Sequence, residues 1–119
     1  MPRILVLDDE PMICMIVQDW LTELDCETVG PAHTVRSALD IVDAVVLDGA
    51  LLDVSLGDEE CYSVADVLHH HGVPFAFATG DKRTGLPDRF KDALILSKPF
   101  DFQAVRAIIG KLLDNHSRS

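Results

Sequence analysis

Three acids follow the first apolar run of the sequence without a gap. The stretch "ILVLDDEP" occupies residues 4–11, so Asp8, Asp9 and Glu10 stand side by side at the end of a hydrophobic segment. Two like charges about 4 Å apart repel by about 4 kcal/mol at an effective dielectric constant of 20, and such repulsion raises the pKa of one carboxyl group. A positive group is therefore expected beside these acids.

Further polar residues lie at the ends of later apolar runs. Asp53 lies near the end of "ALLDV", Thr79 ends "PFAFAT", and Lys98 follows "ALIL". Carboxylate oxygens are ligands for Mg²⁺, while an ammonium group and a hydroxyl group suit a phosphoryl oxygen. Taken singly, each residue could be an ordinary strand end or helix cap. Taken together and in this order, they predict a phosphoryl-transfer site with a carboxylate nucleophile.

Composition narrows the class of protein. The 119 residues fit one domain, and 48% of them are hydrophobic, which is enough for a core. The net charge of −10 argues against a nucleic-acid partner, because a phosphate backbone needs a basic face. No apolar run approaches the roughly 18 residues of a membrane span, so no membrane partner is expected. Three cysteines without a CxxC motif predict buried, reduced thiols in a cytoplasmic protein.

The chemistry-bearing residues need elements to position them, and the sequence alternates between two periodicities. Short apolar runs typical of buried strands occupy residues 3–7, 26–32, 50–54, 74–79 and 93–96. Apolar residues at helical spacing follow Pro11, Thr34, Cys61 and Asp101. This alternation predicts a parallel sheet covered by helices on both faces. Ligands of such sheets bind at the carboxyl ends of the strands. Five polar residues should converge there: Asp8, Asp9, Asp53, Thr79 and Lys98.

The sequence pattern leaves the ends of some strands and helices open. Gly30-Pro31 should end the second strand, and residues 41–47 fit either a helix or a strand. The segment 80–92 is polar and interrupted by two glycines and a proline, so it should hold at most a short helix near residues 86–90. The tail 114–119 should be frayed.

Four stretches resemble the signatures of bacterial response-regulator receiver domains. They are "LVLDDEP", "LLDVSL", "FATG" and "SKPF", and the resemblance covers residues 3–114. It implies an α/β, flavodoxin-like (CheY-like) fold with five parallel strands in the order 2-1-3-4-5, helices on both faces and, in this chain, a short or irregular fourth helix. It further implies a single receiver domain over residues 1–119. The stretch "PFAFATG" is similar to a subgroup of largely stand-alone receivers with a PFxFATG motif, known as FAT GUY.

The resemblance also implies roles for residues in phosphoryl transfer. Asp53 would be the phosphoacceptor, and Thr79 and Lys98 would hold the phosphoryl oxygens. The phosphoryl group would come from a histidine kinase, of the HWE or a related type, or from a phosphotransfer protein. The protein would then be no enzyme beyond its own phosphorylation and dephosphorylation, with output by protein contact or phosphate flow. The bond between Lys98 and Pro99 would be cis.

A magnesium site is part of the same resemblance. Asp9 would ligate Mg²⁺ directly, and Asp8 mainly through water. Asp53 and the backbone carbonyl of Ser55 would supply further oxygen ligands. No cage made of protein ligands alone is expected, so the affinity for Mg²⁺ should be modest.

Two departures from most receivers affect the switch. Most have an aromatic residue three positions before the lysine, where this chain has Ile95. Most also have a solid fourth helix, where this chain has the broken segment 80–92. That segment contains the basic residues Lys82, Arg83, Arg89 and Lys91. Phosphorylation is therefore expected to reorder that segment, which has few apolar anchors, in place of an aromatic rotamer flip.

Two other functions stay open. One is a phosphorylation-independent adaptor with a receiver fold. The other is a carboxylate-nucleophile phosphatase, although that class needs an aspartate two residues after its nucleophile, where this chain has Ser55.

Overall fold

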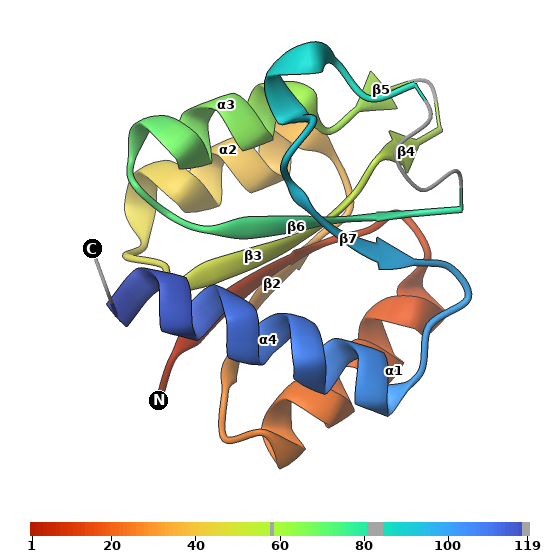
Figure 1. Cartoon of the computed structure of the whole chain (residues 1–119), viewed down its shortest axis with the longest axis vertical. Coiled ribbons are helices and arrows are strands. Elements are labelled where there is room, and N and C mark those ends of the chain that lie inside the picture. Colours follow the sequence, from red (N-terminus) through yellow and green to blue (C-terminus); the bar gives the residue numbers. More distant parts are fainter. Residues whose placement is uncertain (58, 81–84, 118–119) are drawn as a thin grey trace.

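The chain folds around a five-stranded sheet in which all neighbouring strands run parallel (Figure 1). This computed structural model describes residues 1–57, 59–80 and 85–117. The strands of the sheet are β1 (Arg3–Leu7), β2 (Glu27–Ala32), β3 (Gly49–Asp53), β6 (Phe75–Thr79) and β7 (Leu94–Ser97). Their spatial order is β2-β1-β3-β6-β7. Counted in chain order within the sheet this is 2-1-3-4-5, so the predicted topology is confirmed.

Helices cover both faces of the sheet, as predicted. In the part of the chain that the structure describes, the α-helices are α1 (Pro11–Glu23), α2 (Val35–Ala44), α3 (Tyr62–His70) and α4 (Phe102–Ser117). Helices α1 and α4 pack on one face, and α2 and α3 pack on the other (Figure 1). Between β6 and β7, the described residues hold only the 3₁₀ turn η1 (Asp88–Phe90). The prediction that the helix between the fourth and fifth strands of the sheet is short or irregular is therefore confirmed; this element is η1, and α4 follows β7.

Local sequence signals explain where three helices begin. Pro11 is the first residue of α1, where its missing N–H costs no hydrogen bond. The hydroxyl of Thr34 accepts a hydrogen bond of 3.1 Å from the backbone N–H of Ser37 and caps α2. The carboxylate of Asp101 accepts one of 2.9 Å from the N–H of Ala104 and caps α4.

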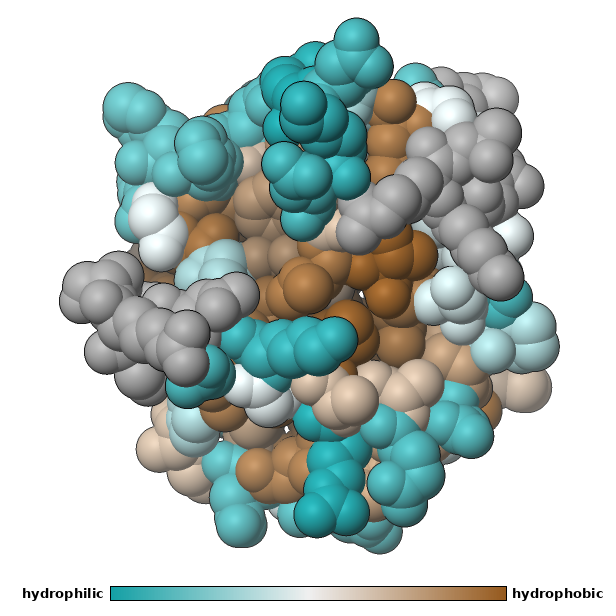
Figure 2. All heavy atoms as spheres, viewed as in Figure 1, coloured by the Kyte–Doolittle hydropathy of each residue, from teal (hydrophilic) through white to brown (hydrophobic). Residues whose placement is uncertain are grey.

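The core forms two layers, one on each side of the sheet. Alternate residues of β1 point to opposite layers: Leu5 and Leu7 pack with α2 and α3, whereas Ile4 and Val6 pack with α1 and α4. This is why β1 is apolar throughout. Figure 2 shows hydrophobic residues gathered near the centre of one face, with hydrophilic residues around them.

The three cysteines are buried, as the sequence predicts. Cys14, Cys26 and Cys61 are all buried free thiols. Burial raises the pKa of Cys14 to about 11 and that of Cys61 to about 12, with Asp8 and Asp53 adding to the respective shifts. No helix among the described residues is both long enough and apolar enough to cross a membrane.

Two boundaries differ from the sequence-based expectation, and a third is one that the sequence pattern left open. Strand β2 continues through Gly30-Pro31, whose peptide bond is cis. It can do so because β2 is an edge strand, where a proline without an N–H is tolerated. Helix α2 includes residues 41–44, and Val45 is already extended. Helix α4 extends to Ser117, so residues 114–117 are helical and only 118–119 lie outside the described residues.

A second, two-stranded antiparallel sheet was not predicted. It pairs β4 (Ser55–Leu56) with β5 (Glu59–Glu60) directly after β3. Strands of two residues are too short to show an alternating pattern, so no periodicity predicts them.

Candidate functional site

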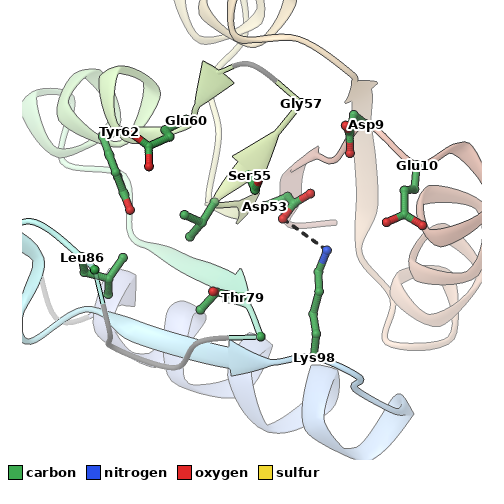
Figure 3. Close-up of a pocket in the computed structure, with 13 residues that line it drawn as sticks. Asp9, Glu10, Asp53, Ser55, Gly57, Glu60, Tyr62, Thr79, Leu86 and Lys98 are labelled. Atoms are coloured by element: carbon green, nitrogen blue, oxygen red, sulfur yellow. Dashed lines mark hydrogen bonds and ion pairs between the residues drawn. The ribbon is translucent and has the colours of Figure 1, made fainter.

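The structure brings the predicted polar residues together at the carboxyl edge of the sheet. Asp8 follows β1, Asp53 is the last residue of β3, Thr79 is the last residue of β6, and Lys98 follows β7. A pocket of about 550 Å³ opens at this edge, and its walls include Asp9, Asp53, Thr79 and Lys98 (Figure 3). The geometry agrees with the expected convergence, and the roles of these residues remain predictions.

Lys98 supplies the positive group expected beside the acids. Its Nζ donates a hydrogen bond of 3.2 Å to Oδ1 of Asp53 and lies 3.6 Å from Oδ2 of Asp8. Burial alone would lower the pKa of Lys98, but the carboxylates of Asp53 and Asp8 outweigh burial and raise that pKa above its ordinary value. Lys98 is therefore charged at neutral pH. The peptide bond between Lys98 and Pro99 is cis, as the resemblance implied.

One lysine does not balance the buried acids. Asp8 is 4% exposed and Asp53 is 5% exposed. Burial, and then the charge of Asp8, raise the pKa of Asp53 to about 6, although the interaction with Lys98 lowers it. The net environment thus disfavours the Asp53 carboxylate, and a further cation would relieve that cost.

The acids that follow β1 are held by the backbone around them. The N–H of Glu10 donates a hydrogen bond of 2.9 Å to Oδ1 of Asp8, and the N–H of Asp8 donates one of 3.0 Å to the carbonyl of Ala32. Nδ1 of His33 lies 2.8 Å from the carbonyl oxygen of Asp8. One carboxylate oxygen from each of Asp8, Asp9 and Glu10 lies within 4.8 Å of the others. These oxygen donors fit a hard cation such as Mg²⁺.

The opposite wall of the pocket was missed by the sequence analysis. Tyr62 from the start of α3, Glu60 from β5 and Leu86 from the segment before η1 all line it (Figure 3). None of these residues belongs to a spacing pattern, and β5 itself was not predicted. Glu10 also lines the pocket, although no role had been assigned to it.

The predicted basic cluster is only partly within the described chain. Lys82 and Arg83 lie outside the described residues, as does the stretch 81–84 of the expected switch segment. Arg89 donates two hydrogen bonds, of 2.9 and 3.0 Å, to the carboxylate of Asp66 on α3. Its guanidinium also lies 4.6 Å from the centre of the Phe90 ring. Phe90 is buried, so the expectation that this segment has few apolar anchors was wrong for η1.

Comparison with known proteins decides the family. Residues 4–110 match the family model of the response regulator receiver domain. The chain belongs to this family. The receiver is 31% identical over 115 residues to the phyllosphere-induced regulator PhyR of Methylorubrum extorquens, a match that covers 93% of this chain and 43% of that protein. The receiver therefore spans less than half the length of this curated relative.

Solved structures agree with this assignment. The solution structure of SdrG from Sphingomonas melonis Fr1 superposes with a TM-score of 0.83 at 39% identity, covering 95% of this receiver and 97% of that chain. The BeF3-activated conformation of SdrG from Pseudomonas melonis Fr1 gives a TM-score of 0.80 at 40% identity, covering 93% and 95%. The response regulator PhyR from Brucella abortus gives a TM-score of 0.82 at 26% identity, covering 98% of this receiver and 49% of that chain.

Proposed function

We propose that this receiver is a single-domain response regulator that accepts a phosphoryl group on Asp53 in a Mg²⁺-dependent reaction. One observation carries the proposal: at the carboxyl edge of the sheet, Lys98 bridges the buried carboxylates of Asp53 and Asp8, and Asp53 and Lys98 line a pocket. A buried cation–carboxylate arrangement of this kind suits a phosphoryl group, whose charged oxygens need a lysine and a metal around them.

The donor is a histidine of a histidine kinase, of the HWE or a related type, or of a phosphotransfer protein. A carboxylate oxygen of Asp53 attacks phosphorus, the bond from phosphorus to the donor's imidazole nitrogen breaks, and the imidazole leaves with the bonding pair. Lys98 offers positive charge to the phosphoryl oxygens, and the hydroxyl of Thr79 is placed at the end of β6 to donate a hydrogen bond to one of them.

The metal site belongs to the same proposal. Asp9, Asp53 and the carbonyl of Ser55 would hold Mg²⁺ directly, and Asp8 would hold it mainly through water. When bound, Mg²⁺ neutralises negative charge on the carboxylates and on the phosphoryl oxygens. The raised pKa of Asp53 is consistent with this assignment, because burial and the charge of Asp8 disfavour its carboxylate and a bound cation would favour it.

The neighbours support a regulator that acts by contact or phosphate flow. The neighbour SdrG has a BeF3-activated conformation, and its chain is matched almost from end to end by this receiver. We infer from this that residues 1–119 act as one receiver domain in the cytoplasm. The PFxFATG resemblance is consistent with such a stand-alone regulator, whose partner would be another protein and neither nucleic acid nor membrane.

Phosphorylation by acetyl phosphate with Mg²⁺ tests the proposal. The intact mass of the wild-type protein should rise by one phosphoryl group, and that of Asp53→Asn should not. Asp19→Asn is the matched control, because Asp19 is an exposed aspartate on α1; it should behave as wild type. An unmodified wild-type protein would favour the adaptor, and steady turnover of an aryl phosphate would favour the phosphatase. Either result would refute the proposal.

A further inference from the structure

Tyr62 joins the phosphoryl pocket to an aromatic cluster. Its side chain lines the pocket, and its hydroxyl end lies on the side of Leu86, across the pocket from Asp53 and Lys98 (Figure 3). Its ring stacks on Phe90, with ring centres 5.8 Å apart at 28°, and meets Phe77 edge-on at 5.9 Å. Tyrosine is suited to such a boundary, since its ring is apolar and its tip is polar.

The aromatic cluster fixes η1 to the rest of the fold. Phe90, at the end of η1, is 6% exposed, and its ring centre lies 6.0 Å from that of Phe75 and 5.1 Å from that of Phe77. Both of those phenylalanines are on β6, the strand that ends in the pocket. Arg89 ties η1 to Asp66 on α3 by two hydrogen bonds. A displacement of the Phe90 ring would therefore displace η1 as well.

Position 95 cannot provide an aromatic link between pocket and surface. Ile95 is aliphatic and half-buried, and it packs against the core layer beneath α2 and α3. Among the described residues that line the pocket, Tyr62 is the aromatic one. It is thus the described residue that belongs both to the pocket and to the ring cluster holding η1.

We propose that Tyr62 couples the phosphorylation of Asp53 to the position of η1. The proposal rests on the function proposed above. A phosphoryl group brings three strong acceptor oxygens into the pocket, and the hydroxyl of Tyr62 donates a hydrogen bond to one of them. The ring follows the hydroxyl, and the stacked ring of Phe90 and η1 follow the ring of Tyr62.

The hydroxyl of Tyr62 is able to donate the hydrogen bond that this coupling requires. Burial, and then the negative charge of Glu60, raise the pKa of Tyr62 above its ordinary value. The hydroxyl therefore keeps its proton at neutral pH and can act as a donor. Phenylalanine would fill the same place in the ring cluster, so the hydroxyl is the part of Tyr62 that packing alone does not require.

Hydrogen exchange with and without beryllofluoride tests the coupling. In wild type with Mg²⁺, beryllofluoride should change the exchange of amides in η1 and at the start of α3. In Tyr62→Phe that change should be lost, while the exchange of the unliganded protein stays close to wild type. Ile95→Val is the matched control at the position where most receivers have an aromatic residue, and it should keep the wild-type response. All comparisons are made at equal bound beryllofluoride, measured by fluorine NMR.

The outcomes separate the two proposals. Absence of bound beryllofluoride on the wild type would contradict the proposed function itself. Bound beryllofluoride with an unchanged η1 in wild type, or with a wild-type response in Tyr62→Phe, would overturn the coupling and leave the phosphoacceptor role intact. Loss of the response in Ile95→Val, but not in Tyr62→Phe, would place the coupling on β7 and would also overturn this inference.

Discussion

At the scale of single residues, the site carries more negative than positive charge. Two buried carboxylates, Asp8 and Asp53, share one lysine, and the pKa of Asp53 is raised to about 6. The proposed function would explain why the fold keeps this unfavourable arrangement. A carboxylate that lacks full compensation is ready for a metal and a phosphoryl group, whereas a fully paired one is not.

Replacing Asp53 by asparagine should stabilise the metal-free protein at neutral pH. Since the folded pKa of about 6 lies above the unfolded value near 3.8, the folded state holds the extra proton between these values. Wild-type stability therefore falls as pH rises from about 4 to about 6, by at most about 3 kcal/mol, because one pKa unit corresponds to about 1.4 kcal/mol. Urea unfolding with chelator across this range should show a flatter profile for Asp53→Asn. Asp19→Asn should keep the wild-type slope, and equal slopes in all three proteins would contradict the assignment.

Replacing Lys98 by methionine should instead destabilise the metal-free protein. The change keeps most of the side chain's volume but leaves two buried carboxylates without their lysine, which should cost about 1–3 kcal/mol in urea unfolding at pH 7.5 without metal. Addition of Mg²⁺ should restore part of that loss, because the cation takes over the role of counter-charge. Lys111→Met, at an exposed position of α4, is the matched control. A Lys98→Met protein as stable as this control would show that the lysine compensates nothing.

At the scale of elements, the strands position the site residues, and strand ends are what the sequence shows best. Asp53 and Thr79 end buried apolar runs, so their convergence follows from the parallel topology. The wall containing Tyr62 could not be foreseen in the same way. It depends on how the start of α3 meets η1, a tertiary contact that the apolar spacing within either element does not reveal.

The ion pair between Arg89 and Asp66 should hold η1 locally and add little to global stability. Both side chains are about half exposed, so the free energy of unfolding of Arg89→Leu should stay close to that of the wild type. Local exchange of the η1 amides should nevertheless become faster, because the turn loses its tie to α3. Arg36→Leu removes a comparable exposed pair with Asp40 on α2 and is the control. Unchanged exchange in η1 would show that the aromatic cluster alone holds this turn.

At the scale of the whole molecule, alternation of strand and helix patterns predicted the parallel sheet with helices on both faces, and the resemblance to receiver domains predicted the strand order. The order of the polar strand ends predicted which side chains lie at one edge of the sheet. The deviations have physical causes that lie outside such patterns. Strand β2 tolerates Pro31 because it is at the edge of the sheet. Helix α4 packs on the sheet through buried residues such as Ile109 and Leu112 and continues to Ser117. Edge position and burial are properties of the assembled molecule and cannot be read from a local window.

Magnesium should stabilise the whole domain through this one site. Because a ligand that binds only the folded state adds RT ln(1 + [L]/Kd), a hundredfold excess over Kd should add about 2.7 kcal/mol at pH 7.5. Asp9→Asn should lose most of this gain, whereas Glu23→Gln, at the exposed end of α1, should retain it. Thermal unfolding with and without Mg²⁺ measures both. Equal stabilisation of the Asp9→Asn protein would remove Asp9 from the metal site.

Locating the phosphoryl group tests the central claim most directly. After phosphotransfer from a histidine donor, borohydride reduces an aspartyl phosphate to homoserine, which peptide mass spectrometry can place in the chain. The account predicts homoserine at position 53, in a reaction that requires Mg²⁺. Homoserine at another aspartate, or a phosphoryl group on a histidine or serine with Asp53 unmodified, would contradict it.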